Sequence, residues 1–228
     1  MQAITMKARW RLEEILNAVT HGIGTALAVA ALTAMLLLYY NDGVYHLTSC
    51  LIYGGSLILL YLASTLYHSF SNERVKAVFK FIDHAAIYVV IAGSYTPFTL
   101  LALPGSFGWK IFCFVWLLAC AGIVFQLFCV KRFRMLGTFC YLAMGWFAVV
   151  MIGPLLETLP LEAVYWLVLG GAFYTVGALF YLIRKIPYNH AIWHLFVLAG
   201  SAAHFVAVFR FVLPMPELVR QLAGLGMF

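Results

Sequence analysis

Charge is scarce in this sequence. Its 228 residues include 14 Lys/Arg and 8 Asp/Glu, so that charged residues make up 10% of the chain, whereas a soluble domain typically carries about 25%. Hydrophobic residues make up 65% and aromatic residues 17%. A soluble domain of this length has too little interior to bury so many apolar side chains. The composition therefore excludes a soluble globular protein and indicates an integral membrane protein.

Cysteine pairs, repeats and linkers are also missing. The sequence has no CxxC pair, which argues against a disulfide framework and against a thiolate zinc site. It contains no low-complexity tract, Gly/Ser linker or clear internal repeat, so a single domain is expected. The excess of basic residues does not predict nucleic-acid binding, because these residues lie at the ends of apolar runs. The five cysteines are Cys50, Cys113, Cys120, Cys129 and Cys140.

Long uncharged apolar runs dominate the chain. A helix needs roughly 20 apolar residues to cross about 30 Å of hydrocarbon, and these runs do not alternate as barrel strands do. We therefore expect an all-α, integral membrane seven-transmembrane-helix bundle. Its predicted parts are an N-terminal segment 1–16, a membrane domain 17–213 and a C-terminal tail 214–228. The predicted spans are 18–40, 46–67, 83–103, 111–130, 135–156, 163–183 and 190–212.

The basic residues predict the orientation of this bundle. Eleven of them lie at the N-terminus or in the even-numbered connections, and three lie on the opposite side. Positive charge favours the cytoplasm, so we expect a multi-pass protein of the cell inner (plasma) membrane, with a cytoplasmic N-terminus and an external C-terminus. The eleven are Lys7, Arg9, Arg11, Arg74, Lys76, Lys80, Lys131, Arg132, Arg134, Arg184 and Lys185; the three are Lys110, Arg210 and Arg220.

Ionisable residues within the spans gather at one depth. His68 ends the second predicted span, Asp83 starts the third, His190 and His194 start the seventh, and His21 lies near the start of the first. Such residues are costly in a membrane and mark functional sites by default. The orientation places all five near the cytoplasmic face, so we expect their side chains to form one polar cluster.

The spacing within this cluster predicts a metal site. His190 and His194 are four residues apart, which places both imidazoles on one helix face where they can bind one ion. Adding His68 gives three histidines from two helices, which match a zinc site that keeps its fourth position for water. His204 lies on the same helix, about 15 Å deeper than His194 at 1.5 Å per residue.

Other polar residues have local alternatives. Ser64 lies one turn before His68, and its hydroxyl either faces that histidine or bonds back to its own helix. Asp83 either faces the cluster or caps a helix N-terminus. Glu14, Asn17 and His21 share one helix face, and Asn17 with His21 could form no more than a structural hydrogen-bonded pair. The histidine pair itself could be packed interfacial imidazoles.

Four motifs in this order resemble the hemolysin III family, the bacterial branch of the progestin and adiponectin receptor superfamily. The Ser, Asp and His residues are also similar to those of alkaline ceramidases. The motifs are Glu14-x2-Asn17-x3-His21-Gly22, Ser64-x3-His68, Asp83-His84 and His190-x3-His194.

The resemblance implies one zinc ion held by His68, His190 and His194, with a water as fourth ligand. It also implies that Asp83 contacts this water and that the Ser64 hydroxyl lies beside it. Four further polar residues then either support the site or only pack within the bundle: Glu14, Asn17, His21 and His204. Receptor relatives are linked to zinc-dependent hydrolysis of lipid amides, and bacterial members to haemolysis and membrane-lipid homeostasis.

Three functions follow as expectations. The first is zinc-dependent hydrolysis of a lipid amide or ester by a ceramidase-like mechanism, with Asp83 as general acid/base and Ser64 as a hydrogen-bond donor. The second is a non-catalytic, zinc-stabilised membrane sensor or regulator, and the third is a hemolysin-like lytic protein. The expected partner is a membrane lipid, with no nucleic acid and no soluble protein partner inferred. Because imidazoles must be neutral to bind metal, zinc affinity is expected to fall below about pH 6.5.

Overall fold

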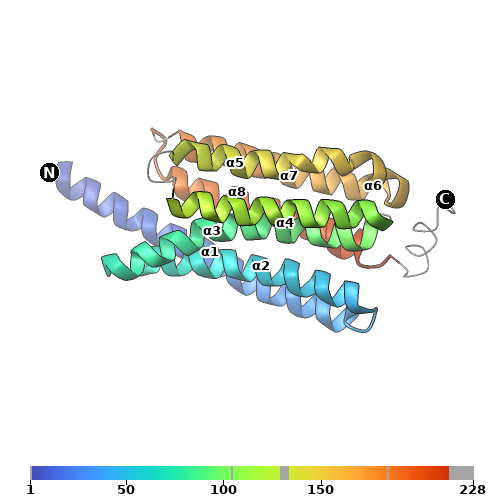
Figure 1. Ribbon diagram of the computed structural model, residues 1–228. Helices are drawn as coiled ribbons and strands as arrows, with labels where there is room; N and C mark the ends of the chain where they lie inside the picture. The colour runs from blue at the N-terminus through green and yellow to red at the C-terminus, as the bar shows by residue number, and fades with distance from the viewer. Residues whose placement is uncertain (1, 104, 129–133, 184, 216–228) are drawn as a thin grey trace.

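The computed structural model describes residues 2–103, 105–128, 134–183 and 185–215, all of whose regular secondary structure is helical. Seven helices are long and apolar enough to cross a membrane, which confirms the predicted all-α, seven-span membrane protein. Figure 1 shows that these helices run roughly side by side in one bundle. The elements are α1 (Gln2–Tyr39), α2 (Val44–Ser69), α3 (Glu73–Pro97), η1 (Phe98–Ala102), α4 (Gly105–Phe128), α5 (Arg134–Trp146), η2 (Phe147–Met151), α6 (Ile152–Thr158), α7 (Leu161–Leu182), α8 (Asn189–Ala207) and η3 (Val208–Val212).

Some sequence predictions fall outside the described residues. Most of the expected tail 214–228 and the end of the fourth expected span, 129–130, belong to this group. Of Lys7 and Arg134 only the backbone is described. The basic residues outside the described ranges are Lys131, Arg132, Arg184 and Arg220.

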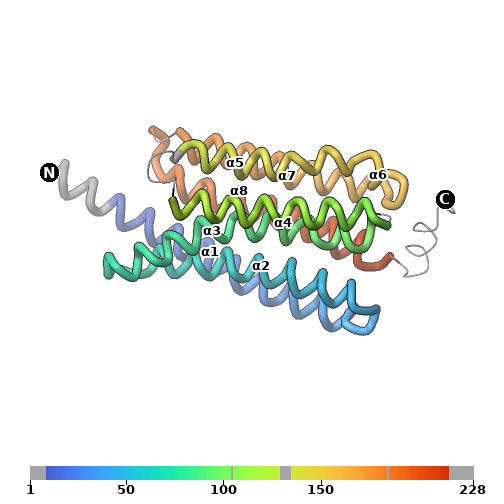
Figure 2. The backbone as a smooth tube through the Cα atoms, in the orientation of Figure 1, coloured from blue at the N-terminus to red at the C-terminus, as the bar shows by residue number. Residues whose placement is uncertain are grey.

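Helices that follow one another in sequence pack side by side. Helix α1 packs on α2, α2 on α3 and α7 on α8, while α8 also contacts α1. The start of α1 and the end of η3 lie at opposite ends of the bundle, as an odd number of spans requires (Figure 2). We call the end that holds the start of α1 and the α2–α3 and α7–α8 connections the N-terminal end. Buried residues make up 72% of the most apolar window of the α3 span, against 17% in the α1 span, so α3 is the central helix.

The connection between α2 and α3 is shorter than the sequence suggests. Asn72 caps α3, because its side-chain oxygen accepts hydrogen bonds from the backbone N–H groups of Arg74 at 3.0 Å and Val75 at 3.2 Å. The alternative that Asp83 caps this helix is therefore wrong, since Asp83 lies ten residues beyond its first residue. An asparagine side chain that bonds two of the first free N–H groups is sufficient to start a helix, and this places Asp83 inside the bundle.

Helix α1 begins earlier than the first predicted span. It is continuous from Gln2 to Tyr39, so the expected short segment 1–16 is, where described, the first part of the same helix. This continuity matters for the site, because Glu14 and Asn17 sit on a rigid helix that packs against both α2 and α8.

The close approach of α2 and α3 depends on Gly93. A Cβ atom at Gly93 would lie 2.8 Å from the Cβ of Ser56 and closer still to its hydroxyl, whereas a Cβ at Gly55 would meet no atom within 4 Å. We expect Gly93→Ala to lower the free energy of unfolding by about 1–3 kcal/mol, since inserted volume forces packed helices apart. Gly55→Ala is the matched control. It is expected to leave the free energy of unfolding unchanged or to raise it by up to about 1 kcal/mol, because alanine has a higher helix propensity than glycine. Thermal unfolding in detergent compares the two, and equal stabilities would contradict this packing.

Candidate metal centre

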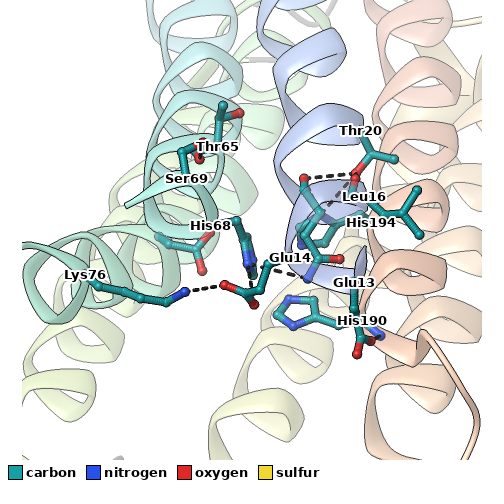
Figure 3. Close-up of polar contacts among 12 residues, drawn as sticks. Glu13, Glu14, Leu16, Thr20, Thr65, His68, Ser69, Lys76, His190 and His194 are labelled. Carbon is teal, nitrogen blue, oxygen red and sulfur yellow. Dashed lines mark hydrogen bonds and ion pairs between the residues drawn. The ribbon is translucent and has the colours of Figure 1, made fainter. Parts of the chain in front are cut away.

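Three histidines converge at the N-terminal end of the bundle. His68 comes from the last turn of α2, and His190 and His194 come from the first two turns of α8. One ring nitrogen of each lies within 4.8 Å of the others. The ring centroids are 4.7 Å apart for His190–His194, 4.9 Å for His68–His190 and 5.2 Å for His68–His194. The predicted convergence of these side chains is therefore confirmed, and the cluster could hold a metal ion (Figure 3).

Helix α1 orients the imidazole of His194. Its Nδ1 lies 3.2 Å from the backbone oxygen of Asn17 and 3.4 Å from the hydroxyl of Thr20. A carbonyl oxygen can only accept, so Nδ1 carries the proton and donates it. The lone pair is then on Nε2, the nitrogen that remains for a metal.

His68 is oriented in the same way by a carboxylate. Its Nδ1 lies 3.2 Å from Oε1 of Glu14, while the ammonium of Lys76 forms an ion pair with Oε2 of the same residue (Figure 3). Its Nε2 is buried and has no hydrogen-bond partner among the described residues. A zinc-binding histidine usually donates a hydrogen bond from its other ring nitrogen to a carboxylate. This hydrogen bond fixes the tautomer of the imidazole and raises the basicity of the nitrogen that binds the metal.

The first turn of α8, which carries His190, is held by α1 and by the end of α7. The backbone N–H of His190 donates to Oε1 of Glu13 at 3.3 Å. The side-chain amide of Asn189 donates to the backbone oxygens of Tyr181 at 3.1 Å and Phe180 at 3.4 Å. These oxygens belong to the last turn of α7, where carbonyls lack partners within their own helix. The first turn of α8 is thereby attached to both α1 and α7.

These residues fit a zinc ion on chemical grounds. Zinc is commonly bound by neutral imidazole nitrogens, and a catalytic site uses three protein ligands. Both His68 and His194 use Nδ1 for a hydrogen bond, so Nε2 is available on each. A buried nitrogen without a partner, as at Nε2 of His68, destabilises a fold unless something binds it.

His21 lies against the cluster. Its ring stacks on that of His194, with centroids 3.5 Å apart and planes inclined by 7°. The alternative of a hydrogen-bonded pair with Asn17 is wrong, because neither ring nitrogen of His21 has a hydrogen-bond partner among the described residues. The side-chain amide of Asn17 instead lies 3.5 Å from Nδ1 of His68.

The structure places Asp83 and Ser64 differently. Asp83 lines a cavity together with His190 and His194, and its Oδ2 lies 3.0 Å from Nδ1 of His84. Ser64 is fully buried and does not line this cavity. Its hydroxyl has no hydrogen-bond partner among the described residues, so the alternative of a bond back to its own helix is also wrong.

The cavity beside the histidines has a volume of about 1410 Å³. It runs between α3, α5, α7 and α8, from Asp83 and His190 at the N-terminal end to Phe98 and His204 deeper in the bundle. His204 lies 14 residues beyond His190, about 21 Å further along α8 at 1.5 Å per residue. A long cavity with mostly apolar walls and a few polar groups has the features of a small-molecule site.

His204 packs α8 against α7, away from the three-histidine cluster. Its Nε2 donates to the backbone oxygen of Leu167 at 3.0 Å, and its ring lies edge-on to Tyr174 with centroids 5.4 Å apart. A Cβ atom at Gly170 would clash with the His204 ring, so this glycine permits the contact.

The sequence does not predict the role of four residues near the site. Lys76 indicates only the orientation in the membrane, and His84 is only part of a motif. Glu13 and Thr20 have no distinguishing pattern, although Thr20 lies three residues after Asn17 on the same helix face. Each acts through a contact with a residue on another helix or beside it, which local spacing does not reveal.

Loss of the Glu14 carboxylate is expected to weaken metal binding. Glu14→Gln removes the charge that faces Nδ1 of His68, and loss of such a support typically reduces metal affinity by about 10–100-fold. Competition with a chromophoric zinc chelator measures the affinity of the detergent-purified protein. Glu162→Gln, in the first turn of α7, is the matched control. Equal affinities of wild type and Glu14→Gln would remove Glu14 from the site.

Comparison with known proteins gives a consistent set of relatives. Residues 9–205 match a family described as "Haemolysin-III related". The chain is 48% identical over 207 residues to "Hemolysin-3 homolog" of Bacillus subtilis (strain 168), covering 90% of this chain and 97% of the relative. It is 45% identical over 214 residues to "Hemolysin-3" of Bacillus cereus, covering 93% and 98%. It is also 30% identical over 211 residues to "Monocyte to macrophage differentiation factor" of Homo sapiens, covering 90% and 86%.

Proposed function

Because this chain is a multi-pass membrane protein that belongs to the Haemolysin-III family, we propose that it hydrolyses an amide or ester bond of a membrane lipid with the help of one zinc ion. One observation carries the proposal. The three-histidine cluster lies beside a carboxylate, Asp83, that lines the same long cavity as His190 and His194. A site used only to tie helices together has no need of a carboxylate on the wall of a cavity.

The metal would be held by His68, His190 and His194. When bound, zinc lowers the pKa of a water from 15.7 to about 7 and so supplies a nucleophile at neutral pH. The protein's own contribution is to keep the ligand nitrogens unprotonated and correctly turned. The Asn17 carbonyl and the Glu14 carboxylate do this, because each accepts the Nδ1 proton of one ligand.

Asp83 is the proposed general acid and base. Its carboxylate accepts a proton from the attacking water as the new C–O bond forms at the acyl carbon. It then returns that proton to the leaving nitrogen or oxygen as the C–N or C–O bond breaks. One water is consumed, and a fatty acid and an amine or alcohol are released. Its Oδ2 lies 3.0 Å from Nδ1 of His84, a close contact that would position the carboxylate for both transfers.

Ser64 is the proposed hydrogen-bond donor to the oxyanion that develops on the acyl oxygen. Its hydroxyl is buried one turn before His68 and has no other hydrogen-bond partner among the described residues. Because it lies behind the cavity wall, this role requires α2 to shift when the substrate binds.

The cavity favours a lipid over a soluble substrate. Its walls deeper in the bundle are mostly apolar, with a few polar side chains such as Ser94, Thr175 and His204, and can accept an acyl chain. Its charged groups, Lys80, Asp83 and Lys185, lie at the N-terminal end. With the predicted cytoplasmic N-terminus, the reacting group of the lipid would lie near the inner leaflet. A lipid-release assay that compares wild type with Asp83→Asn tests this function, and release is expected to be lost in the variant.

A zinc-stabilised sensor is the second candidate function. It is favoured by the way α1 binds both sides of the cluster, through Glu14 to His68 on α2 and through the Asn17 carbonyl to His194 on α8. A metal there would tie α2 to α8, with α1 attached to both through these contacts, and a change in lipid packing would change the spacing of the helices. This function needs the histidines and does not need Asp83.

A further inference from the structure

Two lysines line the cavity at its N-terminal end. Lys80 belongs to α3 and Lys185 to the connection between α7 and α8, and both side chains are exposed. Neither forms an ion pair with any of the described residues. By contrast, the nearby Lys76 is paired with Glu14. Among the residues that the structure describes, Lys80 and Lys185 therefore place two unpaired positive charges at this end of the cavity.

Lys80 is part of the cavity wall by its position on the helix. It lies three residues before Asp83, which places both side chains on one face of α3, about 4.5 Å apart along the axis. Ala77, His84 and Ile87 continue the same lining stripe. Lys185 lies five residues before His190, in the connection between α7 and α8. The two lysines thus line the cavity from two separate segments, and each is close in sequence to a residue that we assign to the site.

Uncharged polar groups complete this end of the cavity. Gln126 of α4 lines the cavity, is 5% exposed, and its Oε1 is buried without a hydrogen-bond partner among the described residues. Thr138 of α5 also lines the cavity and is 6% exposed. A buried amide oxygen without a partner destabilises the free protein and is satisfied when a ligand hydroxyl donates to it.

We propose that Lys80 and Lys185 bind the phosphate of an anionic phospholipid whose acyl chain occupies the cavity, with Gln126 accepting a hydrogen bond from a headgroup hydroxyl. The lysines form charge-assisted hydrogen bonds to phosphate oxygens. The only carboxylate in the described lining, Asp83, already contacts His84, so a choline or ethanolamine cation would meet two ammonium groups without a free anionic partner. This inference names the substrate class of the proposed hydrolase and rests on that function only for the cleavage step.

Lipid binding tests the subsite without any catalytic readout. Native mass spectrometry of the detergent-purified protein compares phosphatidylglycerol with phosphatidylcholine carrying the same acyl chains. Wild type is expected to bind phosphatidylglycerol at least about tenfold more tightly, which corresponds to about 1.4 kcal/mol. Lys80→Gln/Lys185→Gln is expected to lose this preference while its affinity for phosphatidylcholine stays within about twofold. Gln126→Leu is expected to weaken phosphatidylglycerol binding alone.

Lys110→Gln is the matched control, because Lys110 is an exposed lysine near the start of α4, at the opposite end of the bundle. An equal loss in this control would assign the preference to general surface charge and overturn the proposal. A wild type without preference would overturn it as well. Displacement of phosphatidylglycerol by millimolar inorganic phosphate would point to a soluble phosphate ligand and also overturn it. A preference that persists in a protein without hydrolase activity would instead contradict only the proposed function.

Discussion

The detergent-purified protein is expected to contain about one zinc ion per chain, and His190→Ala/His194→Ala is expected to contain none. A site with three protein ligands does not hold zinc on one imidazole, and the double substitution leaves only His68 of the cluster. Elemental analysis by inductively coupled plasma mass spectrometry, after removal of loosely bound metal, gives the stoichiometry. The difference in zinc content between wild type and the double variant is expected to be complete, because the ion is either bound or lost.

The control for this experiment is His46→Ala. His46 is also a buried histidine in a helix, and its Nε2 donates to the backbone oxygen of Leu213 at 3.1 Å, at the other end of the bundle. This variant is expected to keep its zinc, so that loss of metal is assigned to the cluster and not to removal of a buried imidazole. Wild-type protein that stays free of metal after zinc is supplied would make the histidine cluster structural.

The second large effect is expected at Asp83. Asp83→Asn keeps the size of the side chain and removes its capacity to take up a proton, so lipid release should fall by about 10²–10⁴-fold, the usual contribution of a general acid–base group. The zinc content should stay the same, because Asp83 is not part of the three-histidine cluster. The assay measures fatty acid released from a mixture of amide- and ester-linked lipids in detergent, alongside the metal content of the same sample.

The control substitution is Asp42→Asn, in the exposed connection between α1 and α2. It should leave lipid release and zinc content unchanged. Unchanged turnover in Asp83→Asn would remove this carboxylate from the mechanism. Zinc in wild-type protein without lipid release from any substrate would favour the sensor, in which the metal ties α2 to α8 without catalysing a reaction.

The predictable part of this protein follows from two local rules. Hydrocarbon excludes charge and requires each backbone group to bond within its own helix, so the apolar runs predict seven spanning helices without knowledge of their packing. Helical periodicity then places residues four apart on one face, which identified His190 and His194 as a pair. Their convergence with His68 could be anticipated because basic residues predict which helix ends share one side of the membrane.

The sequence predicts a helix boundary wrongly where a single polar side chain sets it. The basic residues Arg74, Lys76 and Lys80 suggested a connection, whereas Asn72 starts α3 before them. That cap moves Asp83 from a helix end to the third turn. It also places Lys80 on the cavity wall and Lys76 within reach of Glu14. Hydropathy does not detect such a start, because it averages over many residues while a cap consists of two hydrogen bonds.

By itself, the sequence determined the membrane class, the number of spans and the residue types that can bind zinc, since these follow from transfer energies and helical spacing. Only the tertiary structure decided which atoms turn those residues into a site. Glu14 and His68 are 54 residues apart, and Asn17 and His194 are 177 apart. The cavity that joins Asp83, Lys80 and Lys185 likewise exists only after α3, α5, α7 and α8 have packed. Contacts between helices depend on rotation and depth in the bundle, which no local pattern along one helix contains.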